Sequence, residues 1–219
     1  FVATVQEKLG DFDIHLMVAN PTGEWTGWPC EKGCNDDPKT CAEDGYQCNV
    51  YPKLITSCDY TLGAGLIFNA GGDAANRQCE LFGGHRYIVS GEPDLADAIE
   101  CIAKVGVSGG EPPMGDALIA ALAPKINAEG GCNAGFLRDD ALLVVAFIID
   151  SEDISSTSWP YQQYQAVVDA KGGDPNAIVA LGVIAQPIKD PPVPGCAYND
   201  IGDQYKMRQL LKKFPYHVE

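Results

Sequence analysis

Three carboxylates fall within four residues in the turn Asp150-Ser151-Glu152-Asp153. Carboxylates this close repel one another unless a cation or hydrogen-bond donors offset their charge. Hard cations such as Mg²⁺ and Ca²⁺ take oxygen ligands of this kind, so the turn is a candidate metal site. The same residues equally suit the N-terminal cap of a helix within a solvated acidic loop. The residue types leave both interpretations open.

Two other motifs match functional sites less closely. Gly106-Val107-Ser108-Gly109-Gly110 fits the G-x-S-x-G pattern of serine hydrolases, which needs a strand before the serine and a helix directly after it. A helix is expected before this segment, so we favour a flexible loop over a nucleophile. The acidic stretches Asn35-Asp36-Asp37 and Glu43-Asp44 lack the alternating spacing of an EF-hand, which favours a solvated loop over a calcium site.

The acidic turn directly follows residues 141–149 (ALLVVAFII), an uninterrupted apolar run. Its length and its Val and Ile content predict a strand that is buried on both faces of a parallel sheet. In open α/β sheets, ligands bind at the carboxyl ends of the strands. The turn would therefore lie at the edge of the sheet where a binding site is expected.

Apolar spacing along the rest of the chain predicts helices that alternate with strands. The predicted strands are residues 12–18, 141–149 and 177–185, with another beginning at 216–219. The predicted helices are residues 1–9, 94–105, one that opens at Pro112-Pro113, 161–171 and 203–214. This alternation predicts an α/β fold with a doubly wound, mostly parallel sheet, forming a single domain over residues 1–219. Residues 24–60 lack clear periodicity and are expected to form a cysteine-rich insertion.

The nine cysteines indicate an oxidising compartment. Five of them lie between Cys30 and Cys58, in C-x3-C and C-x6-C spacing without a nearby histidine, a pattern that favours disulfides over zinc. Because the number is odd, at least one thiol is free or pairs outside this chain, and the spacing does not determine the connectivity. Trp25 and Trp28 of the insertion either cap the edge of the core or form a recognition surface.

Composition excludes two classes of partner. The chain has 30 acidic and 15 basic residues, and its formal net charge of -15 argues against nucleic acid, whose phosphates require Lys and Arg. The longest apolar run is too short for a membrane span. Together with the expected disulfides, these observations predict an exported protein that is extracellular or located at the cell surface.

Residues 135–153 (GFLRDDALLVVAFIIDSED), 164–185 (YQAVVDAKGGDPNAIVALGVIA) and 93–122 resemble secreted von Willebrand factor A-like (VWA) domains of bacteria. The resemblance implies a doubly wound sheet with a metal-ion-dependent adhesion site, built from a D-x-S-x-S loop, a threonine and an aspartate. The aspartate matches Asp150. Glu111, within Gly109-Gly110-Glu111-Pro112, stands in place of the threonine, and Glu152 and Asp153 are further candidate metal ligands. The D-x-S-x-S loop has no counterpart in this sequence.

The resemblance also implies that the chain is a piece of a longer one, because it begins within the first helix and lacks the first strand of the sheet. That strand would lie between residues 12–18 and 141–149. Each unsatisfied buried backbone group costs about 1–3 kcal/mol. We therefore expect a strand from an upstream segment or a neighbouring chain to fill this position. A continuous ladder between the two predicted strands would contradict the expectation.

The sequence thus predicts a non-enzymatic binding or adhesion domain that takes a protein or glycan ligand, with Mg²⁺ or Ca²⁺ as the candidate cation. The alternative is a structural subunit of an extracellular or cell-surface assembly, in which the acidic turn serves only as a helix cap. An exported hydrolase that uses Ser108 is a more distant third interpretation.

Overall fold

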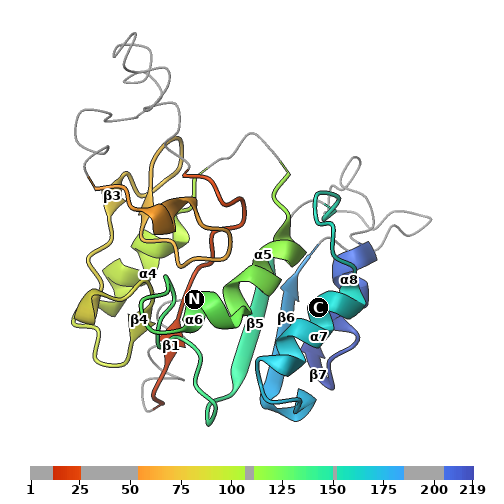
Figure 1. The fold of residues 1–219 in the computed structure, drawn as a ribbon. Coiled ribbons are helices and arrows are strands. Elements are labelled where there is room, and N and C mark those ends of the chain that lie inside the picture. The colour runs from red at the N-terminus through yellow and green to blue at the C-terminus, as the bar shows by residue number, and fades with distance from the viewer. Residues whose placement is uncertain (1–11, 26–53, 107–110, 150–151, 185–204) are drawn as a thin grey trace. The chain divides into compact units, whose positions relative to one another are not determined.

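The structure is a computed structural model that describes residues 12–25, 54–106, 111–149, 152–184 and 205–219 (Figure 1). The chain forms two compact units. The first comprises Phe1–Gly109 with Lys125–Phe136, and the second comprises Gly110–Pro124 with Leu137–Glu219. The helix expected at 1–9 and most of the insertion expected at 24–60 lie outside the described residues. No helix in the described ranges is long and apolar enough to cross a membrane.

The second unit contains a parallel sheet, as the sequence predicts. Its strands β5 (Leu143–Ile148), β6 (Ile178–Val183) and β7 (Tyr216–Val218) lie side by side in that order. All of them run parallel to one another. β5 and β6 match the two long apolar runs, and β7 confirms the strand expected to begin at Tyr216. The described residues therefore form a mixed α/β structure with a three-stranded parallel sheet.

Three helices pack against one face of this sheet, namely α5 (Met114–Leu122), α7 (Pro160–Asp169) and α8 (Tyr205–Leu211) (Figure 1). α8 approaches the sheet closely at Gly182, where an added Cβ would lie 2.4 Å from Leu211 Cδ1. The helices and strands share one buried core, which consists of Leu122, Leu143, Val145, Phe147, Val167, Val168, Ile178, Ala180, Met207, Leu210, Leu211 and Phe214.

β5 alternates between buried and exposed residues, although the sequence predicted burial on both of its faces. Val145 and Phe147 face the core, whereas Val144 and Ile148 are 55% and 76% exposed. The expectation that both faces of β5 are buried is therefore wrong. The physical reason is that α5, α7 and α8 all contribute to the core on the same face of the sheet.

The first unit is built from short strands and one longer helix. β1 (His15–Leu16) pairs with β4 (Ile88–Val89), and β2 (Phe68–Asn69) pairs with β3 (Arg77–Gln78), both antiparallel. The strand expected at 12–18 is thus reduced to β1. α4 (Leu95–Ala103) confirms the helix expected at 94–105, and its N-cap Asp94 accepts a hydrogen bond from Asp97 N. The remaining short helices are η1 (Ser57–Tyr60), η2 (Phe82–Gly84), η3 (Pro175–Ala177) and α6 (Pro124–Asn127).

Two disulfides cross-link the first unit, in agreement with the cysteine content. Cys58 pairs with Cys132, and Cys79 pairs with Cys101. The second bond ties α4 to the segment that follows β3, within the apolar core of the unit. The buried members of this core are Cys79, Leu81, Ile88, Ala98, Ile99, Cys101 and Ile102. The other five cysteines lie outside the described residues.

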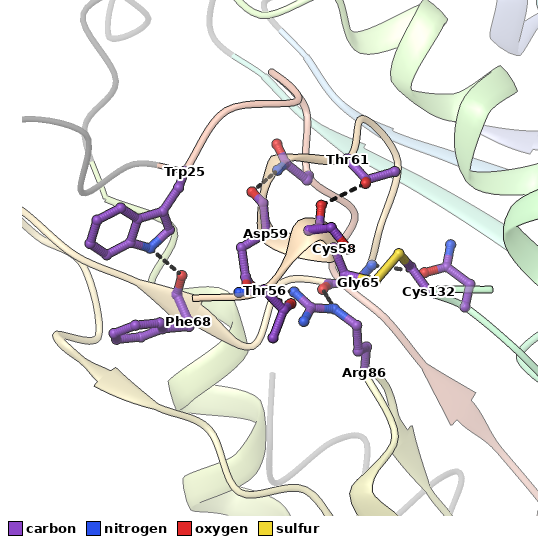
Figure 2. A network of polar contacts seen from close by, with 12 residues as sticks. Trp25, Thr56, Cys58, Asp59, Thr61, Gly65, Phe68, Arg86 and Cys132 are labelled. Atoms are coloured by element: carbon purple, nitrogen blue, oxygen red, sulfur yellow. Dashed lines mark hydrogen bonds and ion pairs between the residues drawn. A yellow bond between two sulfur atoms is a disulfide. The ribbon is translucent and has the colours of Figure 1, made fainter. Parts of the chain in front are cut away.

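A buried ion pair of Asp59 and Arg86 belongs to a polar network in the first unit (Figure 2). The Asp59 carboxylate, 3% exposed, accepts a hydrogen bond of 2.5 Å from Arg86 Nη2. The other carboxylate oxygen accepts from the backbone N and the hydroxyl of Thr56, at 2.7 and 2.8 Å. Arg86 Nε in turn donates to the backbone oxygen of Gly65 at 2.8 Å. Each charge is therefore surrounded by partners, as burial of an ion pair requires.

Buried amides extend this network into the neighbouring loops. Asn20 donates to the backbone oxygen of Asp59 at 3.0 Å, and its side-chain oxygen accepts from the backbone N of Thr22 and Gly23. Asn133 accepts from Gly65 N and donates to the backbone oxygen of Gly63, both at 2.9 Å. These side chains satisfy loop backbone groups that no strand ladder reaches.

Trp25 belongs to the core of the first unit. Its side chain is 1% exposed, its indole N–H donates to the backbone oxygen of Phe68, and its ring lies 5.6 Å from the Phe68 ring (Figure 2). Of the two roles considered from the sequence, this residue caps the core. Trp28 lies outside the described residues.

Replacement of Asp59 by Asn is expected to lower the free energy of unfolding by about 3 kcal/mol, because it leaves the Arg86 charge buried without its counter-ion. The matched control is Asp97→Asn. Asp97 also pairs with an arginine, but the side chains of Arg77 and Asp97 are 47% and 55% exposed, so this change should cost less than about 1 kcal/mol. Urea denaturation of both variants measures the difference, and equal costs would contradict the central role of the Asp59–Arg86 pair.

The hydrogen bonds between β5 and β6 indicate which backbone N–H groups of β5 point away from β6. Ile149 N donates to Val183 O at 3.1 Å, so odd-numbered amides point towards β6. Amide directions alternate along a strand, which turns the N–H groups of Val144, Ala146 and Ile148 towards the outer edge. In the described residues β1 pairs with β4 and β5 pairs with β6. The strand expected to complete the sheet beside β5 stays a prediction.

Hydrogen exchange followed by NMR tests this prediction. In the chain alone, the amides of Val144, Ala146 and Ile148 should exchange at least about tenfold faster than those of Val145 and Phe147, because only the second set is held by β6. Addition of the missing strand should slow the first set and leave the second unchanged. Equally slow exchange of both sets in the isolated, monomeric chain would show that the edge needs no further strand.

Candidate functional site

The residues predicted to ligate a cation all belong to the second unit. Asp150 lies outside the described residues. Glu111 is exposed and precedes α5, while Glu152 and Asp153 lie in the loop between β5 and α7. Among the residues that the structure describes, no three His, Cys, Asp or Glu side chains are grouped so that they could hold a metal ion. Ser108 of the hydrolase-like motif also lies outside the described ranges.

Asp153 joins the loop after β5 to the start of α5. Its carboxylate is 3% exposed, and one oxygen accepts from Gly115 N at 2.9 Å while the other accepts from Ser156 N at 3.1 Å. Gly115 lies in the first turn of α5, where backbone N–H groups have no partner within the helix. Asp153 therefore acts as a helix cap, but for α5 rather than for α7, which follows it in the chain.

Asp116 makes a second set of bonds between the same two segments. One carboxylate oxygen accepts from the backbone N and the hydroxyl of Thr157, at 2.8 and 2.9 Å, and the other accepts from Ser158 N at 2.9 Å. In return, Asp116 N donates to the Ser156 hydroxyl at 3.1 Å. Asp116 has no local signal in the sequence, because its partners lie some 40 residues away along the chain.

The hydrogen bonds to Asp116 also set its acidity. Burial alone raises the pKa of this carboxyl. Hydrogen bonds from the side chain and backbone of Ser158 and from Thr157 outweigh burial and hold the pKa below its ordinary value. At neutral pH the side chain is therefore a carboxylate that accepts from the loop.

α5 and α7 also contact each other closely beside these hydrogen bonds. Gln163, 1% exposed, donates through Nε2 to the backbone oxygen and hydroxyl of Ser158, both at 3.1 Å. Gly115 lies directly against it, since an added Cβ would be 1.9 Å from Gln163 Nε2. Glycine at this position thus allows α5 to approach α7 closely enough for Asp116 of α5 to accept hydrogen bonds from the loop.

The start of α8 also contacts this loop. Glu152 accepts from Lys206 N at 3.1 Å, and Lys206 Nζ donates to the backbone oxygen of Ser156 at 3.4 Å. The same ammonium group lies 5.4 Å from the centre of the Trp159 ring, within the range of a cation–π interaction. Glu152 is thus engaged with protein, and its carboxylate orients the first turn of α8.

The braced loop and the adjacent helix ends present large apolar side chains to solvent. Ile154 is 63% exposed, Trp159 56%, Tyr161 62% and Tyr205 57%. Tryptophan and tyrosine combine a broad apolar ring with a polar edge, and they are enriched among residues that dominate binding energy. We call Ile154, Trp159, Tyr161 and Tyr205 the aromatic surface of the second unit.

Comparison with protein-family models, with curated proteins and with solved structures finds no match for this chain. The similarity to VWA domains therefore rests on the residues quoted from the sequence alone. What the geometry adds is a loop fixed by two carboxylates, with exposed aromatic side chains on it and beside it.

Substitution of Asp116 by Asn is expected to destabilise the second unit by about 1–3 kcal/mol at neutral pH, because Thr157 N and Ser158 N lose a charged acceptor. A carboxyl whose pKa is lowered by folding stabilises the native state above its unfolded pKa, near 3.9, and this stabilisation is lost as the pH falls through the folded pKa. The difference between parent and variant should therefore narrow below about pH 4.

Urea denaturation between pH 7 and pH 2.5 measures this difference. The matched control is Ser155→Ala, which alters an exposed residue of the same loop and should follow the parent at every pH. A gap between Asp116→Asn and the parent that stays constant down to pH 2.5 would show that the Asp116 charge does not brace the loop.

Proposed function

We propose that this chain is an exported, non-enzymatic binding domain whose contact surface is the aromatic surface. One observation carries the proposal: Asp116 and Asp153 fix the loop backbone, and large apolar side chains project from that fixed backbone and its neighbours. Side chains held on a rigid loop lose little conformational freedom when a ligand binds. A solvated acidic turn without these hydrogen bonds would lose more conformational freedom on binding, and would therefore be less suited to hold a ligand.

The disulfides support export. Cys58–Cys132 and Cys79–Cys101 both close the first unit, and bonds of this kind persist in oxidising compartments. An extracellular or cell-surface location follows as part of the proposal. In such a location a small unit with short strands gains stability from cross-links that its limited ladders do not supply.

The ligand that suits the aromatic surface is a protein or a glycan. Trp159 and Tyr161 offer flat apolar faces for an aliphatic side chain or for the apolar face of a sugar ring. Ser155, an exposed residue of the same loop, adds a hydroxyl group beside them. The shared chemistry is an apolar face bordered by hydrogen-bonding groups.

The VWA type remains the fold that we propose for the whole chain, with a doubly wound sheet of which β5, β6 and β7 form part. The parallel strands and the place of Asp150 in the sequence, two residues after the end of β5, support it. In this proposal Asp150 and Glu111 would hold Mg²⁺ or Ca²⁺, whose charge would offset the two carboxylates. Asp153 and Glu152 accept backbone N–H groups and hold the loop that follows Asp150 in the sequence.

Arrays of oligosaccharides and of extracellular proteins, probed with the purified chain, test the proposed function. Trp159→Ala and Tyr161→Ala should each weaken binding to the spots that the parent recognises by at least about tenfold, since anchor residues of this type dominate contacts. The control is Phe82→Ala, which removes an exposed aromatic side chain of the first unit and should leave binding unchanged.

The same arrays in EDTA and in Mg²⁺ or Ca²⁺ report whether a cation takes part. Binding that survives both aromatic substitutions would overturn the proposed surface. Turnover of ester or peptide substrates that disappears in Ser108→Ala would overturn the non-enzymatic assignment.

A further inference from the structure

The two disulfides of the first unit lie in different surroundings. Cys79 and Cys101 are 3% and 2% exposed and belong to an apolar core, so hydrophobic side chains enclose the bond between them. Cys58 and Cys132 are half-buried and lie in the polar network of Figure 2. A disulfide exchanges when a thiolate reaches one of its sulfur atoms, so these surroundings favour exchange at Cys58–Cys132.

The Cys58–Cys132 bond also encloses the other bond in the sequence. It joins residues 74 positions apart, and Cys79 and Cys101, which are 22 positions apart, both lie within that span. The restraint that a cross-link places on a chain grows with the length of the loop it closes. Opening of the outer bond therefore removes the larger restraint, while the inner bond keeps α4 attached to the segment after β3.

The outer bond fastens one short segment to the first unit. Residues 125–136 belong to this unit, whereas the chain directly before and after them belongs to the second unit. Cys132 lies within the segment, and the neighbouring Asn133 side chain accepts from Gly65 N and donates to the backbone oxygen of Gly63, both at 2.9 Å. The disulfide therefore holds Asn133 in place beside the loop whose backbone it satisfies.

Weaker contacts hold the end of the segment. Tyr87 Oη donates to the backbone oxygen of Ala134 at 3.1 Å, and His15 Nδ1 lies 2.9 Å from the backbone oxygen of Phe136. The rings of Tyr87 and Phe136 lie 5.4 Å apart. A single hydrogen bond adds little net stability, because the same groups bond to water when they separate. Among these described contacts, the disulfide is the one that thermal motion does not open.

We propose that Cys58–Cys132 is a redox-controlled latch for residues 125–136, which a dithiol reductant opens. A thiolate of the dithiol attacks one sulfur atom and forms a mixed disulfide, while the other sulfur leaves as a thiolate and takes up a proton. The second thiol of the reductant then closes its own disulfide and releases the remaining cysteine. Two electrons and two protons pass from the dithiol to the protein.

The latch connects the redox state of the first unit to the path of the chain in the second. Residues 125–136 lie in the connection between α5 and β5. With the bond closed, this part of the connection stays on the first unit. With the bond open, its remaining contacts form and break, and the free connection between α5 and β5 becomes longer. The latch is independent of the aromatic surface.

Stepwise reduction tests the latch. The native chain is treated with increasing dithiothreitol, quenched with acid, alkylated in denaturant and mapped by mass spectrometry, so that each cysteine is assigned. Cys58 and Cys132 should be reduced at least about tenfold faster than Cys79 and Cys101, because access limits thiol–disulfide exchange. Oxidised glutathione should then restore the Cys58–Cys132 pair. Equal rates at the two bonds, or a pair that does not re-form, would overturn the proposal.

Hydrogen exchange at the Gly65 amide reports whether the segment is held, because the acceptor of this amide is the Asn133 side chain. Selective reduction of Cys58–Cys132 should make this exchange at least about tenfold faster. The matched control is the adjacent Leu66 amide, which donates to a backbone oxygen at 2.7 Å and should keep its rate. Unchanged exchange at Gly65 after reduction contradicts the latch.

A double variant, Cys58→Ser with Cys132→Ser, reproduces the open state without a reductant. It should show the fast exchange at Gly65 and no further change in dithiothreitol. Protection of the Ile99 and Ile102 amides of α4 shows that the core of the first unit stays folded. Loss of that protection in the variant would mean that the bond is needed for folding itself, which also overturns the proposal.

Discussion

The structure depends on one requirement: loop backbone groups that are not paired within a β-sheet need other hydrogen-bond partners. The strands of the first unit are two residues long, so most of its loop amides cannot be paired by a sheet. Asp59, Asn20 and Asn133 supply acceptors and donors in addition to the backbone–backbone bonds of the loops, and Arg86 pairs with the Asp59 carboxylate. An unsatisfied buried N–H group costs free energy comparable to a lost hydrogen bond, so these side chains determine how the loops fold.

The second unit uses the same physical solution at its candidate site. The acidic residues after β5 suggested a cation from their charge alone. In the structure two backbone N–H groups donate to the Asp153 carboxylate, and Thr157 and Ser158 donate to that of Asp116. Hydrogen bonding to the ionised form stabilises a carboxylate without a metal. The consequence is a fixed backbone next to the exposed Trp159 side chain, and the proposed binding function depends on this rigidity.

In the sheet of the second unit, apolar residues lie on both faces, but the helices cover one of them. β5 and β6 are apolar on both sides, as parallel strands are, but α5, α7 and α8 all contribute to the core on one side. The odd-numbered residues of β5 are buried in that core, whereas the even-numbered Val144 and Ile148 are exposed although they are apolar. An apolar surface in water is a driving force for association, because its burial releases the cost of hydrating it.

The sequence by itself determined the elements whose signals are local. β5 and β6 follow from continuous apolar runs, α4 and α7 from a helical spacing that ends at capping or glycine residues, and the disulfides from the cysteine content. The covered side of β5 and the contact of Asp116 with Thr157 became visible only in the folded chain. These facts depend on where α5 packs against α7, which rests on contacts such as Gly115 with Gln163. Contacts between residues far apart in the chain leave no periodicity, so local spacing cannot reveal them.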